Sequence, residues 1–212
     1  MICVSLREPD YQRLRAGLEG LALAEIRLDA ARLSAEEVKS LFSLPVSLVA
    51  AFRPGGVSQS QRLDTLSLAV RSGAKYVDLE LESPEDFRRE LITIARTSGC
   101  RVIVSYHNPD ETPTRRKLED VIDRCRDAGA DITKMACRVR SSADCARLLS
   151  LYDRAEPMIA FGLGQLGTFT RVVAPFLGAP FTYACLAPGS ETGDGQLDWK
   201  TMQEQIKALA GR

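Results

Sequence analysis

The sequence predicts an α/β fold of the (β/α)8 barrel class, a TIM barrel. Eight short runs rich in Val, Ile and Leu alternate with longer charged, amphipathic stretches. Strict alternation of strand and helix favours parallel strands, and eight such units close into a barrel. The length of 212 residues lies near the lower limit for this fold. Because no composition shift marks a boundary, we expect residues 1–212 to form a single domain.

The predicted strands are rich in apolar and β-branched residues, which is typical of strands that are buried on both faces. They cover residues 2–6, 23–29, 46–52, 75–82, 100–107, 131–139, 157–164 and 180–186. Amphipathic stretches predict a helix after each strand. The clearest helices cover residues 34–44, 58–73, 84–99, 112–129 and 197–211. Ser or Thr precedes several helix starts and Gly follows several ends, as capping requires.

An open doubly wound sheet is the alternative fold for an alternating chain. Such a sheet usually carries a glycine-rich phosphate-binding turn after its first strand. The residues at this place read LREPD (6–10), which favours the barrel.

Charge and cysteine content exclude several functional classes. The 28 basic and 28 acidic residues cancel, unlike the basic surface of a nucleic-acid-binding protein. Six cysteines without a CxxC pair, together with one histidine, predict buried reduced thiols and no metal site. No apolar run approaches the roughly 20 residues of a membrane span, and the N-terminus becomes charged too early for a signal peptide. We therefore expect a cytoplasmic protein that binds neither nucleic acid nor a membrane.

Charged residues interrupt the apolar pattern of two predicted strands. Each of these strands has three charged residues at alternate positions, which places each set on one face. The residues are Glu25, Arg27 and Asp29 in the second strand, and Asp78, Glu80 and Glu82 in the fourth. Because charges are rarely buried unless paired, the two sets form a paired ionic layer inside the barrel, an outward face that meets polar helices, or part of a functional site.

The sixth predicted strand has Lys134 at its centre, on the same face as Ile132 and Ala136. An unpaired lysine in a buried strand would lose its charge, and a neutral amine is a nucleophile toward ketones and aldehydes. His107, the single histidine, stands at the exit of the fifth strand. Since barrel active sites lie at strand exits, we expect Lys134 and His107 to share a site.

Further polar residues follow the other predicted strands. They are Arg53 after the third strand, GLGQLG (162–167) after the seventh, Arg171 in the next helix and ETGDGQ (191–196) after the eighth. A lysine iminium acidifies the neighbouring C–H bond, an imidazole transfers the proton, and arginines hold a carboxylate. We infer Schiff-base chemistry on a small anionic keto acid or keto sugar, with no metal or organic cofactor. Residue spacing leaves aldol cleavage and dehydration both open.

Motifs along the whole chain resemble type I 3-dehydroquinate dehydratase, a shikimate-pathway lyase that makes 3-dehydroshikimate for aromatic amino acid biosynthesis. The motifs are EIRLD (25–29), AFRPGG (51–56), VDLELE (77–82), VSYHNPDETP (104–113), ADITKMA (130–136), GTFTRVVAPFLGAPFTY (167–183) and TGDGQL (192–197). The resemblance implies 3-dehydroquinate as substrate, no cofactor and a homodimer.

The resemblance also implies a role for each site residue. Lys134 would form the Schiff base with the C3 ketone, and His107 would take a C2 proton and then assist loss of the C1 hydroxyl. The other expected residues would bind substrate: Arg171, Gln196 and Thr192 its carboxylate, and Glu25, Arg27 and Arg53 its ring hydroxyls. Thr192 stands where the family usually has Ser.

One departure from the family pattern concerns the orientation of His107. The family commonly has a Glu before the Gly-Gly that follows the third strand, and this Glu orients the histidine. Here Arg53 is followed directly by Pro54 and two glycines. We expect Glu80 or Glu82 to take over this function.

Two further departures concern the closing loop and the barrel floor. Gly193 and Asp194 replace a more usual Ala-Pro pair, which predicts a more flexible loop. Asp194 would weaken carboxylate binding if it pointed inward. Since the sequence starts at its first strand, we also expect no N-terminal hairpin, unlike longer members, and a more open barrel floor.

Two other functions remain open from sequence. A class I aldolase acting on a phosphorylated sugar would use GLGQLG as its phosphate site. A non-catalytic paralogue would bind a ligand without turnover.

Overall fold

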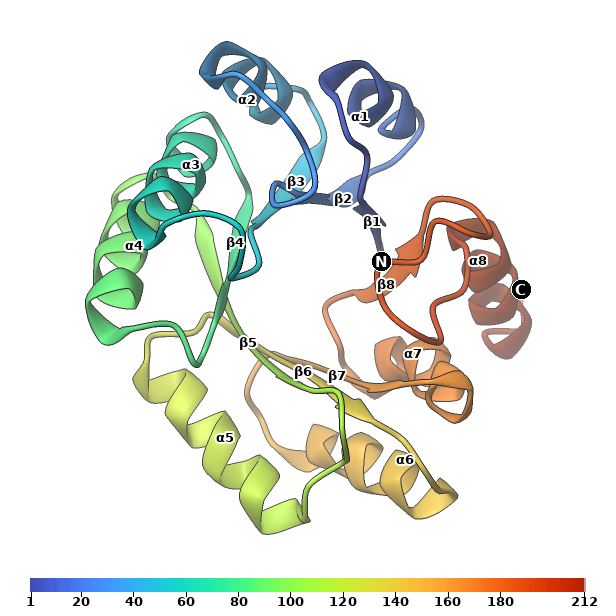
Figure 1. Ribbon diagram of the computed structural model, residues 1–212. Helices are drawn as coiled ribbons and strands as arrows, with labels where there is room; N and C mark the ends of the chain where they lie inside the picture. The colour runs from blue at the N-terminus through green and yellow to red at the C-terminus, as the bar shows by residue number, and fades with distance from the viewer. Residues whose placement is uncertain (212) are drawn as a thin grey trace.

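Eight parallel strands surround the centre of the molecule, and eight α-helices lie outside them (Figure 1). This computed structural model describes residues 1–211. The strands are β1 (Ile2–Leu6), β2 (Leu23–Arg27), β3 (Ser47–Ala51), β4 (Tyr76–Glu80), β5 (Arg101–Asn108), β6 (Ile132–Arg138), β7 (Met158–Leu163) and β8 (Thr182–Cys185). Their hydrogen-bonded order is β7-β6-β5-β4-β3-β2-β1-β8. The predicted (β/α)8 barrel is confirmed.

The helices follow the strands as the alternation predicts. They are α1 (Tyr11–Gly17), α2 (Ala35–Phe42), α3 (Gln59–Arg71), α4 (Glu85–Thr97), α5 (Arg115–Asp127), α6 (Ser142–Leu149), α7 (Thr168–Val173) and α8 (Trp199–Leu209). Reciprocal capping boxes start three of them, at Ser34, Ser58 and Ser141. Within the described residues, no helix is long and apolar enough to cross a membrane.

Two strands end earlier than predicted, which moves two acidic residues out of the sheet. β2 ends at Arg27 and β4 ends at Glu80, so Asp29 and Glu82 lie in the turns beyond them. A side chain in a turn no longer follows the alternation of the strand before it. The expected common face therefore holds for Asp78 and Glu80 but not for Glu82, which pairs with Arg124 of α5 instead.

The barrel has a seam between β7 and β8, where the described residues form no hydrogen-bonded ladder. Aromatic side chains pack across this seam. The ring centroids of Phe161 on β7 and Tyr183 on β8 lie 5.9 Å apart, and Phe181 lies 5.6 Å from Tyr183. Packing of aromatic rings thus closes the barrel where backbone hydrogen bonds do not.

The interior of the barrel changes from apolar to polar along the strand direction. Its lower layer contains Cys3, Leu23, Val49, Ile103, Ile132 and Phe181. One step further along the strands lies a buried polar layer of Ser5, Glu25, Asp78, Ser105 and Lys134. Because all strands are parallel, their carboxyl ends place the last inward side chains around one opening.

Candidate active site

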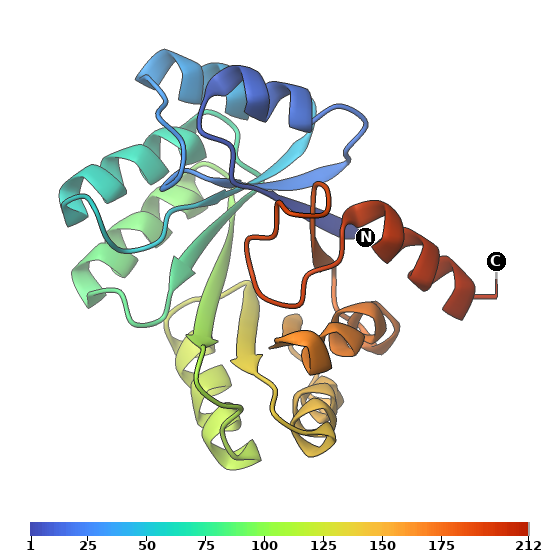
Figure 2. The same ribbon diagram turned by 45° about the vertical axis from the view of Figure 1, so that its right-hand side comes forward.

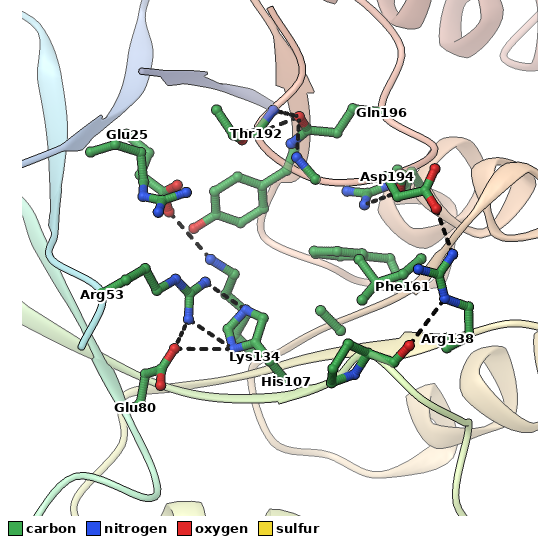
Figure 3. A pocket seen from close by; sticks show the side chains of 17 residues that line it. Glu25, Arg53, Glu80, His107, Lys134, Arg138, Phe161, Thr192, Asp194 and Gln196 are labelled. Atoms are coloured by element: carbon green, nitrogen blue, oxygen red, sulfur yellow. Dashed lines mark hydrogen bonds and ion pairs between the residues drawn. The ribbon is translucent and has the colours of Figure 1, made fainter. Parts of the chain in front are cut away.

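Lys134 occupies the centre of the buried polar layer (Figure 3). Its Nζ atom lies 2.7 Å from Oδ2 of Asp78 and 3.2 Å from Oε2 of Glu25. The hydroxyl groups of Ser105 and Ser5 donate to these two carboxylates at 2.6 and 2.7 Å. The expectation of an unpaired lysine is wrong, because two carboxylates from β2 and β4 converge on it.

These ion pairs keep the buried polar layer charged. Burial works against ionisation of Asp78, but the Lys134 and Arg53 cations outweigh it, and the pKa of this carboxyl is lowered. The ammonium of Lys134 also lies 4.0 Å above the Tyr183 ring, which adds a cation–π contact. The layer is therefore suited to holding one positive charge at Nζ.

His107 lies on the neighbouring strand, one inward position closer to the opening than Lys134. In the β5–β6 register Ser105 pairs with Lys134, and His107 pairs with Ala136. The guanidinium of Arg53 contacts both ring nitrogens of His107, with Nη1 at 2.9 Å from Nδ1 and Nη2 at 2.6 Å from Nε2. A neutral imidazole has one acceptor nitrogen, so only one of these contacts is a hydrogen bond.

Glu80 completes a cluster with Arg53 and His107. Its carboxylate pairs with Nη1 of Arg53 and lies 3.7 Å from Nδ1 of His107. The shorter contact of Arg53 with Nε2 favours that nitrogen as the acceptor, and the Glu80 carboxylate favours the proton on Nδ1. Burial and the Arg53 and Lys134 cations hold the pKa of His107 well below its usual range. The imidazole is thus neutral in this state, as a general base must be.

Arg171 is a buried guanidinium with unused hydrogen-bonding capacity. It is 1% exposed, and its Nε and Nη1 atoms have no hydrogen-bond partner among residues 1–211. Its Nη2 atom donates to the Asp194 carbonyl at 3.4 Å, and the Phe161 ring lies 4.0 Å away. Burial lowers the pKa of Arg171 to about 9. Such an uncompensated group is expensive, so its presence indicates a site for an anionic ligand.

The loop between β8 and α8 folds back over the opening toward the end of β7 (Figure 2). Within it, Oε1 of Gln196 accepts hydrogen bonds from the Thr192 and Gly193 amides at 2.7 and 3.2 Å. The Thr192 hydroxyl lies 3.2 Å from the same oxygen. The Asp194 carboxylate pairs with Nη1 of Arg138. The side chain of Asp194 is therefore neutralised rather than opposed to a ligand.

These residues line one cavity of about 440 Å³ at the barrel opening. All eight sequence-predicted site residues border it: Lys134, His107, Glu25, Arg27, Arg53, Arg171, Thr192 and Gln196. An amine, a neutral imidazole and an unpaired guanidinium around one cavity fit covalent chemistry on a small anionic carbonyl compound.

Comparison with known proteins identifies the family of this chain. The sequence model of the type I 3-dehydroquinase family matches residues 2–211. The chain belongs to the type I 3-dehydroquinase family. A relative from Desulfotalea psychrophila, named 3-dehydroquinate dehydratase, is 37% identical over 95% of each chain. Another of the same name, from Dehalococcoides mccartyi, is 30% identical over 98% of this chain and 94% of its own. The expected family and its enzyme class, a hydro-lyase, are confirmed.

Solved structures of this family share the fold. The type I 3-dehydroquinate dehydratase of Clostridium difficile, solved with covalently modified comenic acid, superposes with a TM-score of 0.88. It is 20% identical, and the match covers 99% of this chain and 92% of that one. The Aquifex aeolicus 3-dehydroquinate dehydratase gives a TM-score of 0.83 at 25% identity, over 99% and 98% of the two chains.

The acidic residues near the site lie partly elsewhere than the sequence led us to expect. Glu82 is 65% exposed and bound to Arg124, so it is too far outside the barrel to orient His107, whereas Glu80 lies close to it. Both oxygens of Asp29 accept hydrogen bonds from Arg27, at 3.0 and 2.7 Å. Asp29 thus fixes the position of Arg27, which we expect to bind the substrate.

The charged residue of the cavity that the sequence analysis did not single out is Arg138. Arg138 is the last residue of β6, four residues after Lys134, and it lines the cavity. Positions four apart on a strand share a face, so the position of Lys134 was the signal that predicts Arg138 inside.

Proposed function

We propose that this protein is a 3-dehydroquinate dehydratase of the shikimate pathway and that Lys134 forms a Schiff base with the substrate ketone. The observation that carries the proposal is the placement of Lys134 and His107 on adjacent strands, both facing one cavity that also contains an unpartnered arginine. A carboxylate at Arg171 would accept hydrogen bonds from this guanidinium, whose Nε and Nη1 atoms have no partner among residues 1–211. Gln196 would donate from its amide NH₂ group, since its oxygen is already bound.

In the first step the Lys134 amine attacks the ketone carbon, and loss of water from the carbinolamine gives an iminium. The Lys134 ammonium must first give up a proton, which the neutral His107 imidazole accepts and then returns to the carbinolamine hydroxyl that leaves as water. The ammonium and the iminium carry the same charge, so Asp78 and Glu25 stabilise both without rearranging. This continuity explains why a nucleophilic lysine is surrounded by acids.

In the second step Nε2 of His107 takes the proton next to the iminium and forms an enamine. The enamine then expels the hydroxyl, which leaves as water with the proton from His107. Hydrolysis of the conjugated iminium releases product and the free lysine. In the ligand-free state Arg53 occupies Nε2 at 2.6 Å. Binding of substrate hydroxyls to Arg53 would pull the guanidinium away and free the base.

Three backbone amides that the aldolase alternative would use to bind phosphate already have partners. In the GLGQLG turn the Gly162 amide donates to the Thr170 hydroxyl at 2.7 Å, and the Gly164 amide donates to the Asp194 carbonyl at 3.2 Å. The Gly167 amide bonds to the Gly164 carbonyl at 2.9 Å. Because these amides are already bound, they are not available to a phosphate group.

The test is reduction of the protein with borohydride in the presence of 3-dehydroquinate, followed by intact mass and peptide mapping. The proposal predicts a substrate-sized adduct on Lys134. Turnover without any adduct would contradict the Schiff base, and neither turnover nor adduct from folded protein would favour the non-catalytic alternative. The homodimer and the cytoplasmic location stay predictions, and sedimentation analysis tests the former.

A further inference from the structure

One ion pair joins the loop between β8 and α8 to the barrel rim at the end of β6. Oδ2 of Asp194 lies 2.5 Å from Nη1 of Arg138, on the far side of the cavity from Arg53 and Glu80 (Figure 3). Nε of Arg138 also donates to the Pro109 carbonyl at 3.1 Å. A single guanidinium therefore connects the loop to the exits of both β5 and β6.

The backbone of the same loop docks against the residues that follow β7. The Asp194 carbonyl accepts from the Gly164 amide at 3.2 Å and from Nη2 of Arg171 at 3.4 Å. The Thr168 hydroxyl donates to the Gly195 carbonyl at 3.0 Å. Because the Asp194 carbonyl accepts a hydrogen bond from Arg171, a movement of Asp194 would change the position of this guanidinium. Arg171 is the residue that binds the anionic group in the proposed function.

The docking requires glycine at the contact. Gly195 has a φ of 77°, which favours glycine, and a Cβ there would overlap the Gly164 carbonyl. Gly193 adds a second flexible position in the loop. A loop with this composition gains little order from its own backbone, so a restraint from outside the loop has a large effect on how often it is closed.

We propose that Asp194 and Arg138 are positioning residues, whose ion pair holds this loop closed and thereby holds Arg171 and Gln196 against the anionic group of the ligand. The inference rests on the proposed function for the identity of that ligand. It reverses the expectation that Asp194 opposes carboxylate binding. The charge of Asp194 is neutralised by Arg138. This ion pair restrains the loop, as the stiffer Ala-Pro pair usual in the family would do.

The first experiment measures amide hydrogen exchange in ligand-free protein for wild type, Asp194→Asn, Arg138→Gln and the double variant. The Gly164 and Gly193 amides should exchange about two- to fivefold faster in each single variant, the range for a partly exposed ion pair. The double variant should exchange no faster than the single ones, because both remove the same interaction. Asp153→Asn is the matched control, since it removes a pair with Arg115 at 2.7 Å outside the barrel.

The second experiment compares the kinetics of the same variants with 3-dehydroquinate. A positioning role predicts a KM raised about two- to fivefold with a smaller change in kcat. Unchanged exchange in both single variants, or an equal change in Asp153→Asn, overturns the proposal. A lower kcat at constant KM overturns it as well. If wild type shows no turnover, the proposed function fails, and the exchange data alone decide whether the ion pair closes the loop.

Discussion

Nζ of Lys134 lies 2.7 Å from Oδ2 of Asp78, and both side chains are only 3% exposed. The lysine is therefore a structural counter-ion as well as the proposed nucleophile. Loss of activity after its replacement does not by itself separate these two functions. The first prediction addresses this point.

Lys134→Met should destabilise the protein and abolish the borohydride adduct. It leaves the Asp78 and Glu25 carboxylates buried together without their cation, at a cost of about 3–5 kcal/mol in the free energy of unfolding at neutral pH. Urea unfolding measures this cost. The double variant Lys134→Met/Asp78→Asn should recover part of the lost stability because it removes one of the two charges. A single variant as stable as wild type would contradict the ionic layer.

Glu80→Gln should lower kcat, and Glu82→Gln should not. Glu80 lies 3.7 Å from Nδ1 of His107 and faces the imidazolium that forms on proton uptake, whereas Glu82 pairs with Arg124 outside the barrel. We expect a loss of roughly tenfold in kcat for Glu80→Gln, which corresponds to about 1.4 kcal/mol. The two variants form a matched pair with the same chemical change.

A purely structural effect of Glu80 would leave the imidazole tautomer unchanged. Because His107 is the single histidine, one pair of ¹⁵N signals reports its protonation. Wild type should show the proton on Nδ1, and Glu80→Gln should shift the population toward Nε2. Equal rates in both variants, or the Nε2–H tautomer in wild type, would disprove the orienting role.

His107 should remain neutral well below pH 6.5 in ligand-free protein. Burial and the Arg53 and Lys134 cations depress its pKa in the folded state, while the unfolded chain takes up a proton near pH 6.5. The stability contribution of a depressed pKa is complete above the unfolded value and is lost as pH falls below it. The free energy of unfolding should therefore decline with falling pH from about 6.5, and His107→Gln should remove this component. An NMR titration midpoint at or above 6.5 would contradict the prediction.

The sequence predicted the barrel well because its signal is local and repeated. Alternation placed Glu25 and Arg27 on one face of their strand and Lys134 beside Ile132 and Ala136, but it did not decide whether the Glu25 face points inward. The ion pair of Lys134 with Asp78 was out of reach, because it depends on which residues of β4, β5 and β6 stand level. The prediction that Glu82 shares a face with Asp78 and Glu80 was wrong for a related reason. β4 ends at Glu80, two residues earlier than the pattern indicated, so the turn beyond Glu80 decides where the Glu82 carboxylate points.

The ion pair between Asp194 and Arg138 joins residues 56 positions apart in the sequence. No periodic pattern connects a loop residue to a strand end at such a separation. The family Glu is absent after β3, and the sequence offers two other acids near His107, Glu80 and Glu82. Only the structure shows that Glu80 lies 3.7 Å from Nδ1 of His107, whereas Glu82 pairs with Arg124.

Arg171→Met should bind substrate poorly yet fold as well as wild type or better. In the ligand-free protein Nε and Nη1 of Arg171 are buried and unpartnered within residues 1–211, so the guanidinium lowers stability while it waits for an anion. Methionine fills a similar volume against Phe161 without this cost. We expect the free energy of unfolding to rise by about 1–3 kcal/mol and KM to rise at least about tenfold. Thermal unfolding with and without 3-dehydroquinate measures stability and ligand binding, and steady-state kinetics measure KM. Ligand should stabilise wild type but not the variant, because only wild type pairs the guanidinium with a carboxylate. A variant that loses stability without ligand would show instead that Arg171 belongs to the packing of the barrel, and its role as an anion site would have to be abandoned.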